Sequence, residues 1–317
     1  MNRQILQSLI WPELGLNQAL FMHKSGNSRA LQTGERVDFD AYMNLFPLGK
    51  WALEAGLSDL SLRLCGSGAA EVEILCHAPG RAPQQLLCEP LLLSASGTRL
   101  TIPLPGIVPR GATLTLALRA LAPVTLKAGH WETTQTPRRP VRLAVVMTTY
   151  RREEAARASA ARFADWAETT RLPVHLIVVD NGRSLSLPPS RHVTILSNAN
   201  LGGAGGFARG LMAARDRGFS HCLFMDDDAS SPMEAIARTR AFLSFVRDCN
   251  TAIAGAMIST DAPDEIWENG ATFHCFPTQL AHGTDLRDGQ AVRAMEAASH
   301  APLPAHAYGG WWFFAFP

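Results

Sequence analysis

Hydrophobic residues alternate with polar ones in several short segments of the N-terminal part of the chain. Residues 59–64, 71–75 and 113–119 each have apolar side chains at about every second position. Alternation with a period of two places apolar side chains on one face of a β-sheet and polar side chains on the other. Turn-forming residues such as Gly66 and Gly68 separate the segments. Closely spaced strands with such turns predict an antiparallel β-sandwich.

The pattern changes after a polar segment at residues 133–140, which contains two prolines and few apolar residues. We therefore predict a domain boundary there, with the β-sandwich at residues 1–136 and a second domain at residues 137–317. Continuous apolar runs of strand length follow at residues 141–147, 174–179, 193–196, 221–225 and 251–257. Segments with the composition of helices lie at about 153–169, 207–217 and 231–247. This alternation predicts a mostly parallel sheet with crossover helices.

The composition excludes several classes of protein. The 317 residues carry a formal net charge of +1, and 47% of them are hydrophobic. These values exclude a disordered or collagen-like chain, and the near-neutral charge argues against a protein built to bind nucleic acid. The six cysteines form no Cys-x-x-Cys pair, which is typical of reduced thiols in a cytoplasmic protein. The apolar runs are too short to span a membrane, and the N-terminus lacks the pattern of a secretory signal.

Polar clusters follow the first four predicted strands of the second domain. They are Thr148-Thr-Tyr-Arg-Arg152, Asp180-Asn-Gly182, residues 197–207 and Asp226-Asp-Asp228. In open parallel sheets, ligands bind outside the carboxyl ends of the strands. Because all four clusters fall at such ends, we expect them to form one site.

The three consecutive aspartates are the sharpest of these features. In an extended chain, Asp226 and Asp228 would point to the same side, and two carboxylates there suit a hard cation such as Mg²⁺ or Mn²⁺. Three adjacent carboxylates also repel one another unless a cation is present. The alternative is a helix cap, because acidic residues are favoured at a helix N-terminus, although one aspartate would satisfy a cap.

The glycine-rich segment at residues 202–206 is expected to be a loop that precedes a helix. Glycines let the backbone approach a ligand closely, and a helix N-terminus favours anions. A flexible turn is the alternative, and we interpret a loose dinucleotide-binding match as coincidence because that pattern belongs after the first strand of its unit. Asp180 can accept hydrogen bonds from a base or a ribose, or it can form a turn. Arg151 and Arg152 can neutralise phosphate or lie in a solvated helical turn.

In this order, the polar segments resemble those of family 2 glycosyltransferases with the GT-A fold. The resemblance rests on Thr148-Thr-Tyr-Arg-Arg152, Val179-Asp-Asn-Gly182, Asn198-Ala-Asn-Leu-Gly-Gly-Ala-Gly-Gly-Phe-Ala-Arg-Gly210 and Phe224-Met-Asp-Asp-Asp228. The asparagine–glycine segment and the triple aspartate are most similar to bacterial galactofuranosyltransferases that extend the mycobacterial galactan. Those enzymes carry a β-sandwich before the catalytic domain. The resemblance implies α/β plus β architecture: an N-terminal antiparallel β-sandwich followed by a GT-A type domain with a mostly parallel, Rossmann-like sheet.

The resemblance also implies roles for individual residues. Asp226 and Asp228 match the metal-binding pair, and Asp227 would lie close to the donor sugar. Trp311 and Trp312 match a paired-tryptophan segment of the acceptor site, with packing in the core as the alternative. Residues expected at the nucleotide-sugar donor are Arg152 at the diphosphate, Asp180 at the uridine, Asn200 near the nucleotide, and Thr149 and Gly203 from the same segments.

The resemblance therefore implies a metal-dependent inverting glycosyltransferase that moves galactofuranose from UDP to a glycan or lipid-linked glycan. A related donor such as dTDP-rhamnose is an alternative. In the related enzymes the catalytic-base aspartate and a metal-binding histidine follow the tryptophan pair, and this sequence stops at Pro317. We therefore expect a partial GT-A domain whose catalytic base is unknown. We expect a cytoplasmic protein, with peripheral association at the inner face of the cell membrane through the acceptor, and a sandwich that positions polysaccharide or mediates oligomer contacts.

Three other functions compete with this hypothesis. A degenerate GT-A protein would bind nucleotide-sugar or glycan without turnover. A nicotinamide-dependent oxidoreductase is disfavoured because the turn after the first strand contains no glycine. A phosphohydrolase that uses Asp226 and Asp228 as nucleophile and acid would carry them after the first strand of its domain, whereas here they follow the fourth predicted strand.

Overall fold

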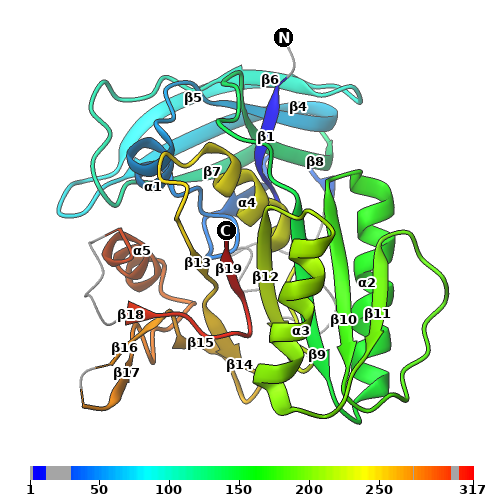
Figure 1. Ribbon diagram of the computed structural model, residues 1–317. Coiled ribbons are helices and arrows are strands. Elements are labelled where there is room, and N and C mark those ends of the chain that lie inside the picture. Colours follow the sequence, from blue (N-terminus) through cyan, green and yellow to red (C-terminus); the bar gives the residue numbers. More distant parts are fainter. Residues whose placement is uncertain (1–2, 12–29, 274, 301–306) are drawn as a thin grey trace.

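The computed structural model describes residues 3–11, 30–273, 275–300 and 307–317. In this part of the chain, strands outnumber helices, and five α-helices and one short π-helix accompany the sheets. Figure 1 shows a β-rich part at the top and a sheet flanked by helices below it. The expected mixture of β and α/β structure, with the β-rich part first, is confirmed.

The β-rich part is an antiparallel sheet of eight strands that bends over on itself. Along the sheet the order is β1-β8-β4-β7-β3, with β2 beside β8 and with β5 and β6 beside β4. The strands are β1 (Gln4–Ser8), β2 (Ala30–Leu31), β3 (Arg36–Phe39), β4 (Ser61–His77), β5 (Gln84–Leu93), β6 (Thr98–Thr101), β7 (Thr113–Ala120) and β8 (Val124–Thr133). Apolar side chains from both halves of β4 are buried in one core, as the alternating pattern predicted.

A single long strand, β4, joins the two halves of this sheet. Its first half pairs with β6 and β8, and its second half pairs with β5 and β7. The prediction of separate strands at 59–64 and 71–75 with a glycine turn between them is therefore wrong. A Cβ at Gly66 or Gly68 would lie against the carbonyl oxygen of Thr125 or Pro123, closer than the 3.0 Å that real Cβ atoms keep. The glycines thus let the continuous strand approach the backbone of Pro123 and Thr125 closely.

The second sheet begins with four parallel strands in the order β11-β10-β9-β12. Their bounds are β9 (Leu143–Thr149), β10 (Val174–Asp180), β11 (Val193–Ser197) and β12 (His221–Asp226). Each lies within two residues of a predicted strand. Strands β9, β10 and β12 are buried along most of their length, whereas β11 at the edge of the sheet is only half-buried. The sequence did not indicate that β19 (Phe314–Phe316) pairs antiparallel with β12 and lies between β12 and β13 (Ile253–Ala254).

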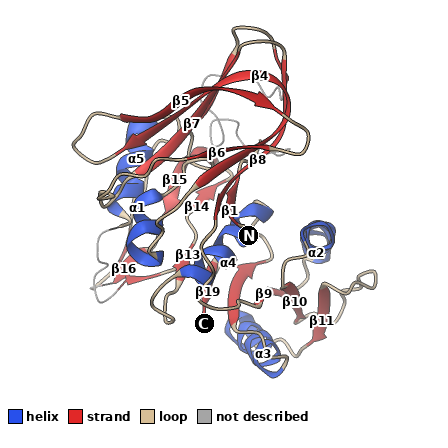
Figure 2. Cartoon of the chain, turned by 90° about the horizontal axis from the view of Figure 1, so that it is seen from above, coloured by secondary structure: helices blue, strands red, loops and turns tan. Residues whose placement is uncertain are grey.

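Helices cover both faces of this sheet. Apolar side chains of α2 (Glu153–Thr170) and α4 (Met233–Phe245) pack in one cluster, and those of α3 (Gly202–Asp216) pack in another on the opposite face. Figure 2 shows α2 and α3 on opposite sides of the row formed by β9, β10 and β11. The crossover helices that the sequence predicted are therefore present.

Helix α4 attaches the parallel sheet to the β-rich part. Arg238 donates hydrogen bonds to the carbonyl oxygens of Ser8 and Met43, both at 2.6 Å. Glu234 accepts the backbone N–H of Ser8 at 2.6 Å and forms an ion pair with Arg238 at 3.3 Å. Trp51 packs edge-on against aromatic rings of the same helix. These contacts fix the orientation of the two parts (Figure 2).

The remaining elements lie after β13 or around the chain segment that precedes β4. They are α1 (Leu48–Lys50), the π-helix η2 (Trp51–Ala55), β14 (Met257–Ser259), β15 (Ala262–Glu268), β16 (Ala271–Phe273), β17 (Pro277–Gln279), α5 (Gly289–Ala298) and β18 (Ala307–Tyr308). Val292 and Met295 of α5 are buried in the core of the β-rich part. The sequence analysis predicted none of the elements after β14.

An ion pair anchors α5 to the β-rich part. Lys50 Nζ lies 2.9 Å from Glu296 Oε1, and His300 Nε2 lies 3.3 Å from the same oxygen. The His300 ring is held by the backbone N–H of Gly111, which donates to Nδ1 at 3.1 Å. Burial alone would raise the pKa of Glu296, but the charge of Lys50 and the hydrogen bonds from His300 and Lys50 outweigh it and lower the pKa to about 2. The carboxylate is therefore ionised and stabilises the folded state.

We expect Glu296→Gln to lower the free energy of unfolding at pH 7 by about 3 kcal/mol. Because the pKa of Glu296 in the folded state lies below its ordinary value of 4.5, the stabilisation is present above about pH 4.5 and is lost as the pH falls toward 2. Urea unfolding of wild type and variant between pH 3 and 7 measures this, with the exposed Glu154→Gln as control. A difference between wild type and Glu296→Gln that does not shrink below pH 4.5 would contradict the assignment.

Candidate functional site

The carboxyl ends of the parallel strands lie in one row. Thr149 at the end of β9 is paired with Asp180 at the end of β10, and Asp180 is paired with Ser197 at the end of β11. On the other side of β9, Thr148 is paired with Asp226, the last residue of β12. The polar clusters that follow these strands therefore share one edge of the sheet, as expected. Whether each residue has its expected role is a separate question, which depends on its contacts.

Asp180 is almost fully buried, with 2% of its surface exposed. One carboxylate oxygen accepts the backbone N–H of Gly182 at 2.8 Å, and the other accepts that of Leu185 at 2.7 Å. These are the contacts of the turn-forming alternative, in which the side chain shapes the loop that follows β10. Contact of Asp180 with a nucleotide stays a prediction.

Asn181 is a residue that the sequence analysis passed over. Its Nδ2 donates to the carbonyl oxygen of Gly202 at 3.2 Å, and its Oδ1 accepts Asn198 Nδ2 at 2.9 Å. It thereby ties the loop after β10 to the segment that leads into α3. The sequence signal for this role was the presence of asparagines in two neighbouring turns, at Asn181 and Asn198, since asparagine side chains commonly bond to the backbone of turns.

The glycine-rich segment is not a loop. Helix α3 begins at Gly202, so the glycines form its first turns, whereas the sequence predicted a helix from about Phe207. A Cβ at Gly206 would lie against the side chain of Thr148, and one at Gly210 against that of Val146, both well inside 3.0 Å. These two glycines therefore allow the helix to pack closely on β9, which is a structural reason for their presence.

Gly203 and Asn200 lie at the exposed start of the same helix. A Cβ at Gly203 would meet no heavy atom within 4 Å, so this glycine faces open space. Asn200 is exposed, and its Oδ1 accepts the backbone N–H of Gly202 at 3.2 Å. The side chain thus accepts the first backbone N–H of α3. The expected contact of Asn200 with a nucleotide stays a prediction.

The aspartates do not follow the geometry expected of an extended chain. Strand β12 ends at Asp226, and Asp227 and Asp228 lie in a turn, so alternation no longer places Asp226 and Asp228 on one side. Asp227, with 11% of its side chain exposed, accepts the hydroxyl hydrogen of Thr149 at 2.7 Å. This bond connects the turn after β12 to the end of β9.

Arg152 supplies the positive charge beside the aspartates. Its Nη1 lies 2.5 Å from Asp228 Oδ2 and 3.4 Å from Asp227 Oδ1. The hydrogen bond to Asp228 and the charges of both carboxylates raise the pKa of the guanidinium. Within the described residues Asp226 forms no such ion pair. Burial, followed by the charges of Asp228 and Asp227, raises the pKa of its carboxyl group, and the charge of Arg152 opposes this only in part.

The residues as placed do not form a metal site. Among the described residues, no three His, Cys, Asp or Glu side chains converge in an arrangement that could hold a metal ion. Two of the three aspartates point their carboxylates at Arg152 instead. The ligand chemistry suits Mg²⁺ or Mn²⁺, but the cation that neutralises the cluster in this structure is the guanidinium.

Backbone strain accompanies this edge of the sheet. Arg151, between β9 and α2, has a φ of 56°, and Arg183, in the loop after β10, has the same value. The left-handed region costs a non-glycine residue about 1–2 kcal/mol, and such residues cluster at functional sites. The guanidinium of Arg151 lies 5.0 Å from the ring centroid of Tyr150, and among the described residues it forms no ion pair with the aspartates that bind Arg152.

The two tryptophans do not form a joint surface. Trp311 is 45% exposed and packs edge-on against Phe207 of α3 and Phe224 of β12, at 5.3 and 5.2 Å between ring centroids. Trp312 packs against the cluster on the opposite face of the sheet and donates its Nε1–H to the carbonyl oxygen of Gly255 at 3.1 Å. Antiparallel pairing of β19 with β12 directs the segment before β19 toward the carboxyl end of β12, where the aspartates lie.

Comparison with known proteins gives little guidance. No protein-family profile matches the sequence, and no curated protein matches it. Among solved structures, a mannosyltransferase from Pyrobaculum calidifontis in complex with GDP-Man and Mn²⁺ is similar, with 18% identity, a TM-score of 0.26, and coverage of 38% of this chain and 36% of its own. An acetyl xylan esterase from the rumen bacterium Butyrivibrio proteoclasticus has 12% identity, a TM-score of 0.17, and coverage of 56% of this chain and 49% of its own. We draw nothing about activity from similarities this low.

The described helices offer no candidate for a membrane span, since none combines sufficient length with sufficient apolar character.

We expect Gly206→Ala to lower the free energy of unfolding by about 1–3 kcal/mol, because the new methyl group would push α3 away from Thr148. Gly203→Ala, in the same helix but facing open space, should leave stability unchanged or raise it by up to about 1 kcal/mol. Chemical denaturation of both variants measures the difference. Equal effects at the two positions would mean that close packing is not the reason for Gly206.

We expect Arg152→Gln to bind Mn²⁺ about tenfold more tightly than the wild type, because the variant leaves three adjacent carboxylates without their counter-charge. Arg151→Gln is the matched control, since its guanidinium contacts Tyr150 rather than the aspartates. Titration of each protein with Mn²⁺ alone, followed by calorimetry, gives the affinities. Unchanged or weaker binding in Arg152→Gln would show that guanidinium and metal do not compete.

Proposed function

We propose that this protein binds a nucleotide-sugar and transfers the sugar to a glycan acceptor. The observation that supports the proposal is the alignment of the strand ends, which brings Thr149, Arg152 and the three aspartates to one edge beside the start of α3. In open parallel sheets this edge is where ligands bind. A diphosphate needs cationic and N–H donors, and Arg152 and the first turn of α3 offer both.

The proposed chemistry depends on whether Arg152 can exchange its carboxylate partner for a diphosphate. Arg152 is half-exposed, so its guanidinium can leave Asp228 and bind a diphosphate oxygen with little loss of packing. Asp227 is held by Thr149, which keeps its carboxylate in place when the guanidinium moves. The positive charge that Arg152 would bring to the leaving diphosphate stabilises the negative charge that develops as the glycosidic bond breaks.

The finer assignments belong to the same proposal and come from the resemblance. The donor is UDP-galactofuranose, Asp180 and Asn200 lie near the nucleotide, and Mg²⁺ or Mn²⁺ joins Asp226 and Asp228 after Arg152 has moved. The exposed face of Trp311 receives the acceptor, because aromatic faces suit the C–H faces of sugar rings and the segment that carries this residue leads toward the carboxyl end of β12. We further propose that residues 1–136 and 137–317 are the two units of the protein.

A second candidate function is binding of the nucleotide-sugar without turnover. The ion pair between Arg152 and Asp228 favours it, since a guanidinium already occupies the carboxylates that a catalytic metal would need. Both candidates require the same donor site and differ only in whether the sugar is transferred.

The donor site is tested by calorimetry with UDP and with uridine. We expect Arg152→Gln to weaken UDP binding by about tenfold or more, because it removes a charge-assisted contact to the diphosphate. Uridine, which has no diphosphate, should bind both proteins equally, and Arg151→Gln should bind UDP as the wild type does. Wild-type protein that binds NADH but not UDP would refute the proposal. Release of UDP from UDP-galactofuranose in the presence of a galactofuranosyl acceptor then separates transfer from binding alone.

A further inference from the structure

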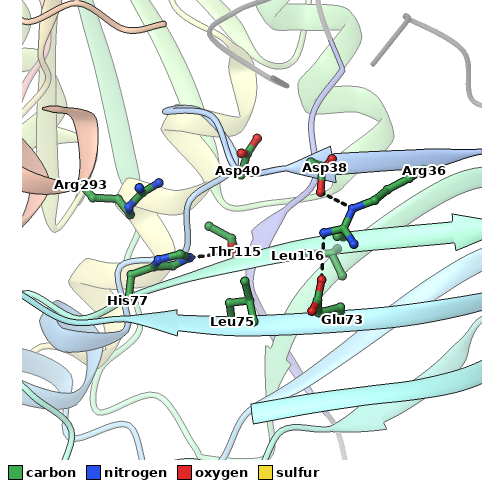
Figure 3. Close-up of a pocket in the computed structure, with 10 residues that line it drawn as sticks. Arg36, Asp38, Asp40, Glu73, Leu75, His77, Thr115, Leu116 and Arg293 are labelled. Atoms are coloured by element: carbon green, nitrogen blue, oxygen red, sulfur yellow. Dashed lines mark hydrogen bonds and ion pairs between the residues drawn. The ribbon is translucent and has the colours of Figure 1, made fainter. Parts of the chain in front are cut away.

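A cavity of about 120 Å³ lies on the β-rich part, away from the strand ends just described. Its walls come from β3, β4 and β7 and from one side chain of α5, Arg293 (Figure 3). Along β3 and β4 the lining residues alternate with buried core residues such as Val37 and Ile74, so the cavity opens on the sheet face opposite the core. We propose that this cavity is a binding site for a single sugar residue or a similar neutral polyhydroxyl compound.

On the right-hand wall of the cavity in Figure 3, three charged side chains pair with one another. Arg36 Nε donates to Asp38 Oδ1, and Arg36 Nη2 donates to Glu73 Oε2, both at 2.8 Å. One guanidinium thus holds two carboxylates on neighbouring strands in fixed positions. Each carboxylate oxygen has two lone pairs, so both groups can still accept hydrogen bonds from a ligand.

The opposite wall consists of a histidine, a threonine and an arginine, and it contains no ion pair among the described residues. His77 Nε2 and Thr115 Oγ1 are 2.9 Å apart, which fixes the imidazole ring. Burial, with a further contribution from the charge of Arg293, lowers the pKa of His77, so the ring is neutral near pH 7. Within the described residues, Arg293 forms no hydrogen bond or ion pair, and Figure 3 shows its guanidinium directed toward His77. The guanidinium is therefore an available donor.

The charges exclude most ligand classes. A metal ion would lie between two guanidinium groups, and among the described residues no cluster suited to a metal is found. An anion would face the carboxylates of Asp38, Asp40 and Glu73. A purely apolar ligand would remove water from the remaining lone pairs of the carboxylates and from the guanidinium of Arg293, at a cost of about 1–3 kcal/mol for each polar group left unsatisfied.

A neutral polyhydroxyl compound satisfies both kinds of group. Each hydroxyl can donate to a carboxylate and accept from a guanidinium or imidazole, and Leu75 provides an apolar surface for the C–H face of a ring. With a volume of about 120 Å³ on the face of the sheet opposite the core, the cavity can take one face of a sugar ring and is too small to enclose a nucleotide.

The helix that carries Arg293 is anchored to the β-rich part. Val292 of α5 is fully buried in the core of that part, and Glu296 of α5 is bound by Lys50. The anchored helix fixes the point from which the Arg293 side chain extends, so its guanidinium can reach a ligand in this cavity. This site shares no residue with the strand-end site and does not depend on the proposed transferase function.

The test is saturation-transfer NMR of the full chain with methyl glycosides of galactofuranose, galactopyranose, glucopyranose, mannopyranose and rhamnopyranose. We expect at least one to bind and Arg293→Met to weaken its binding by about tenfold or more. Arg287→Met is the matched control, because Arg287 pairs with Asp285 and Asp264 and does not line the cavity. A second variant, Glu73→Gln, changes the opposite wall of the cavity without altering α5 and should also weaken binding.

Three results would overturn the inference. The first is that no glycoside binds, and the second is that Arg293→Met and Arg287→Met bind the glycoside equally well. The third is displacement of the glycoside by sulfate or Ca²⁺, which would identify an anion site or a cation site. Arg152→Gln separates this inference from the proposed function. It should bind the glycoside as the wild type does, whether or not the protein binds UDP.

Discussion

In-register parallel pairing of β9 with β10 and β12 is the constraint on which the candidate site depends. The hydrogen bonds between these strands place Thr149 beside Asp180 and Thr148 beside Asp226, so that polar residues far apart in sequence meet at one edge. A register shift of one residue would reverse the faces on which their side chains lie. Close contact of α3 with β9 at Gly206 maintains this edge from one face, and α2 and α4 cover the other. Loops that begin at a fixed edge can hold their side chains in fixed positions even where they are exposed.

The sequence predicted best those features that depend on local pattern. Buried strands such as β9 and β10 were located to within two residues because their apolar runs are continuous. The sequence predicted a loop at residues 202–206 where the structure has the first turns of α3, because glycine-rich segments usually form loops. Here Gly206 lets α3 approach Thr148, a residue distant in sequence. At the site, the shared sheet edge was predicted correctly, whereas the contacts among its side chains, such as that of Arg152 with Asp228, were not predicted. Whether Asp228 faces a metal or Arg152 depends on a turn that begins where alternation ends, and no periodic pattern encodes it.

The acidic turn illustrates how a protein stabilises like charges before a ligand is present. Arg152 pairs with Asp227 and Asp228, and Thr149 donates a hydrogen bond to Asp227. Burial and the charges of its two neighbours raise the pKa of Asp226, and the charge of Arg152 opposes this shift only in part. A guanidinium on an exposed side chain is a mobile counter-charge, unlike a bound metal. Arg152 can therefore stabilise the free protein and later bind an anionic ligand, but it cannot do both at once. The mixed-charge cavity on the β-rich part follows the opposite principle, because there Arg36 stays fixed between two carboxylates.

Insertion of β19 between β12 and β13 has a consequence for how the chain acquires its structure. Strand β12 is complete long before Phe314–Phe316 leaves the ribosome, and until then the edge of β12 has no neighbour on that side. An unpaired apolar edge can pair with another molecule, so nascent chains are exposed to aggregation during this interval. Pairing across so large a sequence separation also delays the final folding step. Production of the protein should therefore be sensitive to translation speed and to the availability of chaperones.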